Sequence, residues 1–193
     1  MAKKILLGGL VGGIVAFLVS GFFHMATSLG EYGIKTLPNE DATLSMMRTS
    51  IPESGLYLYP GAGMSHGNSP AVQVAFLQKY KTGPAGILAY TKEGGDFSFG
   101  KLLLNQFLFS LVAALFLAWI LGLTVGATSY ASRAAIVFIA SLFAACIYAL
   151  PYWNWYRFPL NYTVAYIFTW SVSWLIAGLA MAAIVKPRAG ASA

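Results

Sequence analysis

The sequence predicts an all-α membrane protein, in which four transmembrane helices form a bundle and a small α+β extracytoplasmic insert separates the first and second helices. Three observations predict this fold. Hydrophobic residues make up 58% of the chain and charged residues only 9%, against roughly 25% charged residues in a soluble domain. The hydrophobic residues form four long runs. All six acidic residues lie in one polar segment between the first two runs.

Each hydrophobic run is long enough to cross a bilayer. Ile5 to Phe23 would extend roughly 28 Å as a helix, close to the ~30 Å thickness of a hydrocarbon core. We interpret this run as a retained anchor and not as a signal peptide, because it exceeds the usual apolar region of about 7–15 residues and no clean cleavage site follows it. The three later runs are Leu102 to Val125, Ala134 to Leu150 and Tyr162 to Val185.

These runs divide the chain into four parts. Residues 1–27 hold the first transmembrane helix, and residues 28–100 form the insert. Residues 101–188 hold the second, third and fourth helices, and residues 189–193 are a short tail. Four crossings put both ends of the chain on the same side of the membrane.

The distribution of charge predicts which side this is. The basic residues on the side of the termini have no acidic residue among them, and they are Lys3, Lys4, Arg133, Lys186 and Arg188. Because positive charge is enriched on the cytoplasmic side of membrane proteins, we expect cytoplasmic termini and an insert on the opposite side. In a bacterium this describes a multi-pass protein of the inner membrane with a periplasmic insert.

Small residues recur at four-residue spacing within the hydrophobic runs. Such residues let helix backbones approach closely inside a membrane. We favour packing within the bundle as their role, and the alternative is a face that receives a helix of a partner protein. The residues predicted to pack in this way are Gly9, Gly13, Ala118, Gly122 and Gly178.

The insert contains two segments with the same plan, a helix followed by a strand. Asn39 is the predicted N-cap of the first helix, and Ser69 is that of the second. The strand-like sequence Gly55–Tyr59 resembles Gly86–Tyr90 at an offset of 31 residues. We expect the two strands to pair. Because an isolated two-stranded ribbon is marginally stable in water, the insert needs the membrane helices or a partner to cover its hydrophobic side.

An aromatic segment follows the third run. Tyrosine and tryptophan favour the headgroup region of a membrane, so this segment is interpreted first as an interfacial anchor. It is also the candidate contact site for a ligand such as a lipid, quinone or pigment, or for another subunit. The candidate contact residues are Trp153, Asn154, Trp155, Tyr156 and Arg157, with the polar pair Asn105 and Gln106 from the outer end of the second run.

Few residues are candidates for metal binding. His24 and His66 lie near methionines and are candidate ligands of copper or haem iron. No HExxH or paired Glu-x-x-His motif accompanies them. We therefore interpret His24 as a polar residue at the membrane interface and His66 as a loop residue, and expect no metal site.

The motifs and the placement of charged residues in the sequence disfavour catalysis, ion coupling and nucleic-acid binding. The glycine-rich segment Gly61–Gly67 lacks the spacing of a P-loop, and Ser65 is not part of a nucleophile elbow. The single cysteine, Cys146, excludes an internal disulfide. Ionisable residues are absent from the middle of the runs, whereas ion-coupled transporters place them there. The basic residues form no concentrated stripe that would bind nucleic acid.

We therefore expect a protein that is not an enzyme. The expected function is that of a non-catalytic accessory or structural subunit of a larger bacterial inner-membrane complex, respiratory or photosynthetic. Its expected partners are other integral-membrane subunits and membrane lipids, and no cofactor is predicted. The alternative is a protein that binds a lipid, quinone or pigment at its outer aromatic edge.

Overall fold

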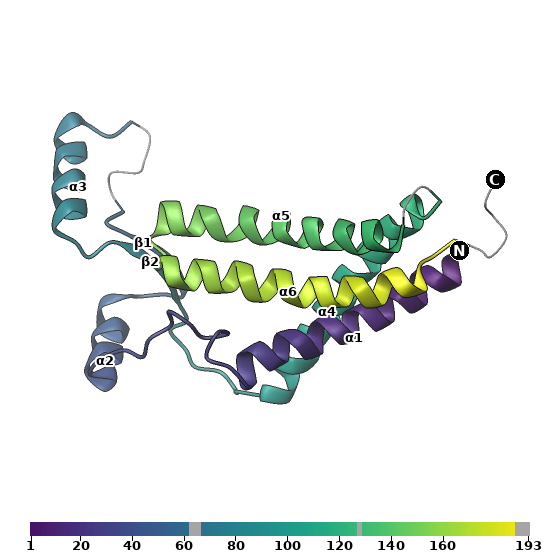
Figure 1. Ribbon diagram of the computed structural model, residues 1–193. Coiled ribbons are helices and arrows are strands. Elements are labelled where there is room, and N and C mark those ends of the chain that lie inside the picture. The colour runs from purple at the N-terminus through teal and green to yellow at the C-terminus, as the bar shows by residue number, and fades with distance from the viewer. Residues whose placement is uncertain (62–66, 127–128, 188–193) are drawn as a thin grey trace. The chain divides into compact units, whose positions relative to one another are not determined.

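The computed structural model describes residues 1–61, 67–126 and 129–187. These ranges contain helices and one two-stranded sheet (Figure 1). The helices are α1 (Ala2–Met25), α2 (Glu40–Ser50), α3 (Pro70–Thr82), α4 (Phe99–Thr124), α5 (Tyr130–Tyr156) and α6 (Leu160–Ile184). The strands are β1 (Gly55–Tyr59) and β2 (Gly86–Tyr90).

Four of the helices, α1, α4, α5 and α6, are long and apolar enough to cross a membrane. Their lengths are 24, 26, 27 and 25 residues. The prediction of four apolar helices with a small two-stranded sheet is confirmed. Each helix begins two to four residues before the apolar run that predicted it, because hydrophobicity marks the lipid-facing part of a helix and not its hydrogen-bonded ends.

The largest difference from the expected boundaries is in α5. The third run was expected to stop at Leu150, before Pro151, but the helix continues through this proline to Tyr156. Proline removes one N–H donor from a helix, and hydrophobic membrane helices tolerate this loss better than soluble ones. The first part of the aromatic segment is therefore helical, and residues 157–159 alone connect α5 to α6.

The chain divides into two units, which we describe separately. The helical unit comprises Met1–Tyr32, Phe97–Ala149 and the chain from Asn161 onward. The insert unit comprises Gly33–Asp96 together with Leu150–Leu160. The insert unit therefore contains the end of α5 and the turn that follows it.

In the helical unit, α1 contacts two other helices through two glycine pairs. Gly8 and Gly12 face α6, where a Cβ atom added to Gly12 would lie 2.5 Å from Met181 Cγ. The other pair, Gly9 and Gly13, faces α4. Residues four apart lie on one side of a helix, so each of the two overlapping pairs leaves a shallow groove on its own side of α1. Their lack of side chains lets the backbones of α4 and α6 approach α1.

Glycines on α4 and α6 also lie at close contacts between helices. A Cβ atom on Gly178 of α6 would lie 2.8 Å from Val137 Cβ of α5, and one on Gly122 of α4 would lie 2.5 Å from Ile5 Cδ1 of α1. Ala118 is fully buried in the core of this unit. The other buried hydrophobic residues of the core are Ala16, Ala114, Leu121, Val137, Trp174, Ala177, Met181 and Val185.

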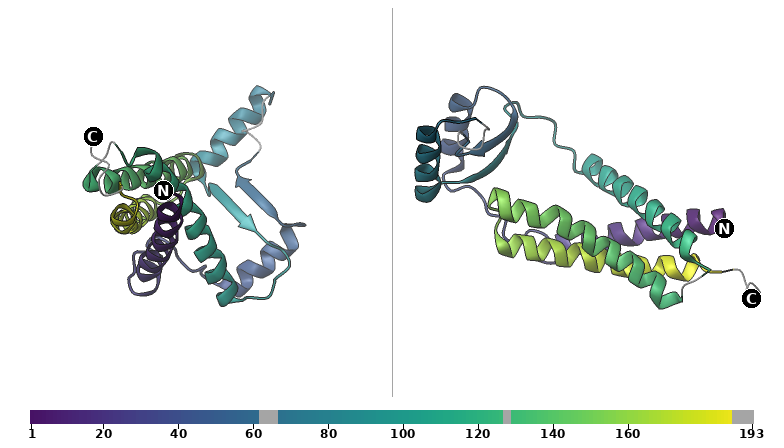
Figure 2. Two further views of the ribbon diagram at one scale, coloured as in Figure 1. Left: turned by 90° about the vertical axis from the view of Figure 1, so that its right-hand side faces the viewer. Right: turned by 90° about the horizontal axis from the view of Figure 1, so that it is seen from above.

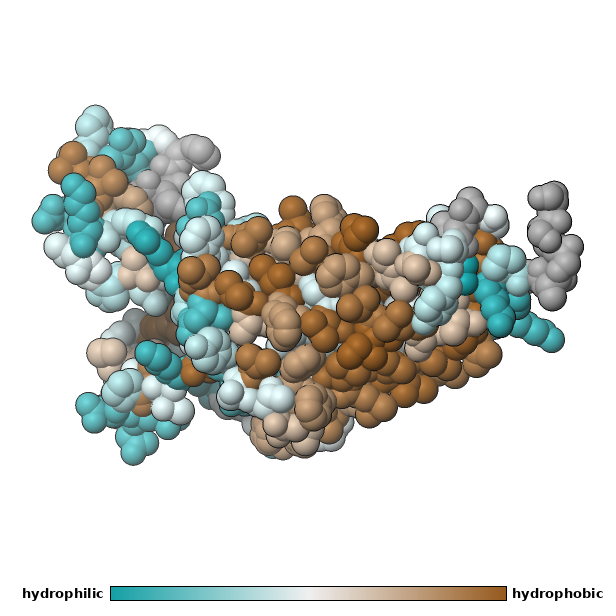
Figure 3. All heavy atoms as spheres, in the orientation of Figure 1, coloured by the Kyte–Doolittle hydropathy of each residue, from teal (hydrophilic) through white to brown (hydrophobic). Residues whose placement is uncertain are grey.

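The outward faces of the four long helices are hydrophobic as well. Leu6, Leu18, Phe116 and Phe143 are each more than 60% exposed. Figure 3 shows hydrophobic side chains over most of the visible face of these helices. A hydrophobic surface of this extent is rare on a soluble monomer, whereas it matches a lipid environment.

The insert unit repeats one helix and one strand. The offset of 31 residues that relates Gly55 to Gly86 carries β1 onto β2 at both ends and carries α2 to within one residue of the ends of α3. The expected strand pairing is confirmed: β1 and β2 are antiparallel neighbours (Figure 2). Tyr57 pairs with Leu88 at the centre of the ladder, and the same offset relates these two residues. The two strands are thus related by a local pseudo-twofold axis through the centre of the ladder.

The two predicted caps behave differently. Ser69 Oγ accepts a hydrogen bond from the Val72 backbone N–H at 3.4 Å, as expected for an N-cap. Asn39 occupies the N-cap position of α2, but its side chain makes no capping hydrogen bond with a described group. The backbone of Asn39 is left-handed, with φ 51°, and the usual capping geometry requires an extended backbone. The prediction that Asn39 is the N-cap residue of α2 is confirmed in position, and only its capping geometry departs from the usual one.

Both faces of the two-stranded ribbon are hydrophobic. Because side chains alternate along a strand, the register places four aliphatic residues on one face and three tyrosines with a leucine on the other. The aliphatic face is Leu56, Leu58, Ile87 and Ala89, and the tyrosine face is Tyr57, Tyr59, Leu88 and Tyr90. Among the described residues of the insert unit, Gly86 is the one that is buried. The insert therefore has hydrophobic residues without a core of its own.

Candidate functional site at the end of α5

The candidate contact residues of the aromatic segment lie on the last turn of α5. Trp153 and Trp155 are 43% and 63% exposed, whereas Tyr156 is half-buried. Asn154 is exposed between the two tryptophans. Because α5 is helical here, these residues point to different sides of the helix and do not line a single loop.

Arg157 directly follows α5 and has an unusual backbone conformation. Its φ is 63°, in the left-handed region, which costs roughly 1–2 kcal/mol for a residue with a side chain. Glycine usually occupies this position after a helix. The Arg157 side chain has a specific contact here, since its Cζ atom lies 4.6 Å from the centre of the Tyr80 ring. This cation–π contact joins the end of α5 to α3 within the insert unit.

Further rings lie on the two segments that form this contact. Tyr152 lies 5.4 Å from Tyr156 and 5.1 Å from Phe158, measured between ring centres. The Phe158 backbone N–H donates to the Tyr152 carbonyl at 3.3 Å, which closes the turn after α5. On α3, Phe76 lies 5.7 Å from Tyr80. The site is thus a cation over one aromatic ring, with further aromatic residues on the same two segments, close to the end of a candidate membrane span.

The two segments that form this contact contain basic residues and no acidic residue. Lys79 and Lys81 flank Tyr80 in the last turn of α3, where they also complement the negative end of the helix dipole. Neither α3 nor the segment Leu150–Leu160 contains an acidic residue. Arg157 is the basic group that contacts the Tyr80 ring, and Lys79 and Lys81 are its neighbours in the chain.

The polar pair on α4 belongs to the other unit. Asn105 is half-buried and Gln106 exposed, and the Gln106 backbone carbonyl accepts a hydrogen bond from Ser110 Oγ at 3.0 Å. Both residues lie in the helical unit, whereas Trp153 to Arg157 belong to the insert unit. We therefore describe the two groups as separate sites.

The two histidines were the candidate metal ligands. His24 Nδ1 lies 2.9 Å from the Ser20 carbonyl oxygen, so the imidazole is held by its own helix. His66 lies outside the described residues. Within the part of the chain that the structure describes, no group of three or more His, Cys, Asp or Glu residues is placed to hold a metal ion.

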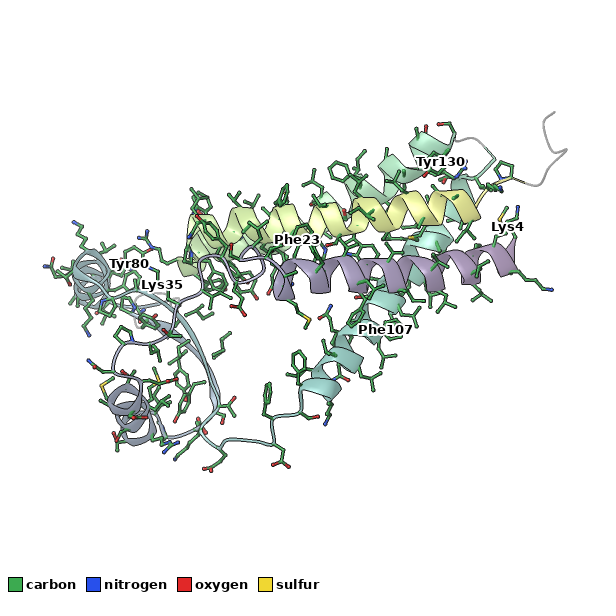
Figure 4. The ribbon with its side chains drawn as sticks, turned by 60° about the horizontal axis from the view of Figure 1, so that its bottom comes forward. Lys4, Phe23, Lys35, Tyr80, Phe107 and Tyr130 are labelled. Atoms are coloured by element: carbon green, nitrogen blue, oxygen red, sulfur yellow. The ribbon has the colours of Figure 1, made fainter. Side chains whose placement is uncertain are left out.

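A second cluster of basic residues lies at the C-terminal end of α6. Lys4 Nζ donates to the carbonyls of Lys186 at 2.9 Å and Pro187 at 3.2 Å. Arg133, buried in the first turn of α5, donates through Nη2 to the Ala182 carbonyl at 3.1 Å. Figure 4 shows Lys4 and Tyr130 at this same end of the helical unit. Both cations complement the negative end of the α6 dipole. Arg133 binds a carbonyl of the last turn of α6 that has no partner within the helix, and Lys4 binds the carbonyls of the segment that follows the helix.

Sequence reasoning did not find Tyr80, Lys79 or Lys81 as parts of the aromatic site. The sequence presents Tyr80 as one hydrophobic position of a helix, distant along the chain from Arg157. The two lysines on either side of Tyr80 were the available signal for a charged aromatic site. They do not indicate which cation stacks on the Tyr80 ring.

No family model, characterised protein or solved structure matches this chain. The function is therefore argued from the residues of the chain and their contacts.

The conformation of Arg157 predicts an order of stability among its variants. Arg157→Gly is expected to be about 1 kcal/mol more stable to unfolding than Arg157→Ala, because glycine adopts the left-handed conformation without the steric cost that alanine retains. Both variants lose the contact with Tyr80, so the comparison isolates the backbone cost. Unfolding by denaturant, monitored by tryptophan fluorescence, measures the difference. An alanine variant equal to or more stable than the glycine variant would contradict the left-handed backbone.

Proposed function

We propose that this protein is a non-catalytic accessory or structural subunit of a larger complex in a bacterial inner membrane, respiratory or photosynthetic. The orientation that accompanies this proposal has cytoplasmic termini and a periplasmic insert. The observation that carries it is the insert itself. Its ribbon has two hydrophobic faces, and among its described residues Gly86 alone is buried.

Hydrophobic groups without a core support an interaction function. Leu56, on the aliphatic face, is 70% exposed, and Tyr59, on the tyrosine face, is 40% exposed. Burying one large aliphatic side chain contributes roughly 1.5–3 kcal/mol, so covering both faces would contribute substantially to stability. Each strand of the ribbon also has an unpaired edge, and such edges are usually covered in native proteins. Another subunit could cover both the faces and the edges.

The sequence contains no recognised catalytic motif, which is compatible with this proposal. The acidic residues of the chain all belong to the polar segment between the first two apolar runs. Arg133, the buried base of α5, binds a carbonyl at the end of α6 and so has a structural partner. We therefore propose that the exposed hydrophobic groups of the insert serve assembly with other subunits, and we propose no reaction.

A variant of the ribbon tests the accessory role. In the source membrane, Leu56→Ser is expected to reduce the fraction of the protein found in a larger complex by about tenfold, equivalent to ~1.4 kcal/mol of lost hydrophobic contact. The complex is weighed by native mass spectrometry after mild detergent extraction. Leu37→Ser is the matched control, because Leu37 is 46% exposed but lies outside the ribbon.

The outcomes of this experiment distinguish docking at the ribbon from the absence of a partner. Loss of the complex in Leu56→Ser with retention in Leu37→Ser supports docking at the ribbon. A wild-type chain that is extracted as a bare monomer under the mildest conditions contradicts the accessory role.

A second candidate function is favoured by the contact between Arg157 and Tyr80. This alternative is a protein that binds a lipid, quinone or pigment at the outer aromatic edge, where Trp153 and Trp155 offer exposed rings. A monomer that keeps a fixed extra mass in the same native spectra would favour it. The retained molecule is then identified by organic extraction and mass spectrometry.

A further inference from the structure

Basic side chains from different helices meet at one end of the helical unit. The start of α1 lies beside the end of α6, since Lys4 Nζ donates to the carbonyls of Lys186 and Pro187 (Figure 4). Near the same end of α6, Arg133 of α5 donates to the Ala182 carbonyl. The packing of this one unit therefore gathers cations where α1 begins and α6 ends.

Acidic residues do not balance these charges. The sequence of the helical unit contains one acidic residue, Glu31, and it follows the opposite end of α1. This helix has 24 residues and is roughly 36 Å long, several times the Debye length of about 8 Å at physiological salt. The first turn of α1 also contains no acidic residue, although the positive end of a helix dipole favours an anion. The start of α1 therefore favours an anionic partner.

Lys3 lies on the same side of α1 as a row of exposed hydrophobic residues. Residues three, four and seven positions apart share one side of a helix. At these distances from Lys3 lie Leu6, Leu7 and Leu10, which are 63%, 52% and 44% exposed. Because α1 is long and apolar enough to cross a membrane and Lys3 stands in its first turn, the row faces acyl chains and the lysine extends to the headgroups.

Lys4 is held beside this row. Its side chain is half-buried, and its bonds to the carbonyls of Lys186 and Pro187 are 2.9 Å and 3.2 Å long. An ammonium group has three N–H donors, so the third can bind a phosphate oxygen. The two carbonyls also restrict the side chain, which lowers the entropy that a bound ligand would cost. Lys3 and Lys4 thus provide an exposed cation and a positioned one.

We propose that Lys3 and Lys4 bind the phosphate of an acidic phospholipid, whose acyl chains lie along the row of Leu6, Leu7 and Leu10. An acidic phospholipid matches both the charge and the hydrophobic row, whereas a free phosphate matches the charge alone. The inference rests on α1 crossing a membrane and not on the accessory role. It also differs from the second candidate function, because this site lies in the helical unit and the aromatic edge lies in the insert unit.

The test measures which lipids the full-length protein retains. Wild type and variants are reconstituted into nanodiscs of phosphatidylcholine and phosphatidylglycerol in equal amounts. The proteins are then released in mild detergent and weighed by native mass spectrometry. The variants are Lys3→Gln alone and Lys3→Gln with Lys4→Gln. Glutamine at position 4 keeps N–H donors for the carbonyls that follow α6 and removes the charge.

Lys101→Gln is the matched control. Lys101 is exposed in the first turn of α4, so it is also a lysine at the start of a long apolar helix in the helical unit. Gly9 meets Leu115 and Gly13 meets Leu111, so α4 runs antiparallel to α1. Lys101 therefore lies at the other end of the unit from Lys3.

We expect the wild type to retain phosphatidylglycerol in preference to phosphatidylcholine. Lys3→Gln is expected to weaken this retention about fivefold and the double substitution about thirtyfold, equivalent to ~1 kcal/mol for each cation at an anionic surface. Lys101→Gln is expected to change it less than twofold. Circular dichroism verifies that the variants fold. Because Lys3 is exposed, Lys3→Gln alone keeps the test decisive if the double variant unfolds.

Soluble glycerol phosphate separates a lipid from a free anion, because it has a phosphate and no acyl chains. At equal concentration it is expected to leave the retained lipid in place. Displacement by glycerol phosphate, equal retention of the two lipids, or equal losses in Lys3→Gln and Lys101→Gln would each overturn the proposal. Failure of the accessory role leaves the experiment intact, because it uses the reconstituted protein without other subunits.

Discussion

Replacing Gly13 by valine is expected to lower the free energy of unfolding of the protein by about 2–3 kcal/mol, the usual cost of overpacking a closely packed contact. A Cβ atom at this position would lie 2.8 Å from Leu111 Cα and 3.2 Å from Leu111 N. Both are backbone atoms of α4, and no rotation of a side chain can make room. The variant must therefore separate α1 from α4, which also disturbs the neighbouring contacts of Gly9.

Gly21→Val is the matched control on the same helix, because no described atom lies within 4 Å of a Cβ atom added to Gly21. Its effect is expected to stay within about 0.5 kcal/mol, as for other exposed substitutions. Equilibrium unfolding in mixed micelles, monitored by circular dichroism, measures both variants. Equal stabilities would show that α1 and α4 do not pack as the structure places them. A partner helix on the Gly9 and Gly13 face is then the surviving interpretation.

Replacing Arg133 by glutamine is expected to destabilise the protein by roughly 2–3 kcal/mol. Arg133 is 4% exposed, and its Nε and Nη2 atoms lie 3.4 Å and 3.1 Å from the Ala182 carbonyl oxygen. A hydrogen bond from a charged donor contributes about 1.5–3 kcal/mol, and a cation at the end of a helix adds up to about 1 kcal/mol when it is near the dipole. The substitution weakens both contributions at the end of α6.

Lys3→Gln removes the same charge from an exposed position and controls for the net charge. This control is expected to change the unfolding free energy by less than about 0.5 kcal/mol. Hydrogen exchange adds a local measurement, since the last turn of α6 is expected to lose protection in Arg133→Gln and to keep it in Lys3→Gln. A stable Arg133→Gln protein with unchanged exchange would contradict a structural role for this arginine.

Local sequence signals were sufficient for most of the secondary structure. The strands of the insert follow from the similar sequences at Gly55–Tyr59 and Gly86–Tyr90, whose boundaries the structure reproduces. Ser69 and Pro70 marked the start of α3 because capping acts over a few residues. Pro151 misled the prediction for α5, since a proline stops most helices in water but not one surrounded by hydrophobic residues.

The candidate site was predictable in part. The aromatic residues were recognised from their concentration after the third run, and Arg157 was named among the candidate contact residues. Its partner Tyr80 could not be predicted, because a contact between distant segments depends on how the chain folds back and leaves no local periodicity. The left-handed backbone of Arg157 could not be predicted either, because arginine usually adopts a negative φ.

The sequence by itself determined that this chain has four apolar helices with a two-stranded insert, because hydrophobic length and alternation are properties of neighbouring residues. It also determined that small residues recur along α1. The tertiary structure alone decided that Gly8 and Gly12 face α6 while Gly9 and Gly13 face α4, and that Arg157 stacks on Tyr80. These contacts join residues far apart in the chain, and their geometry depends on the packing of whole helices.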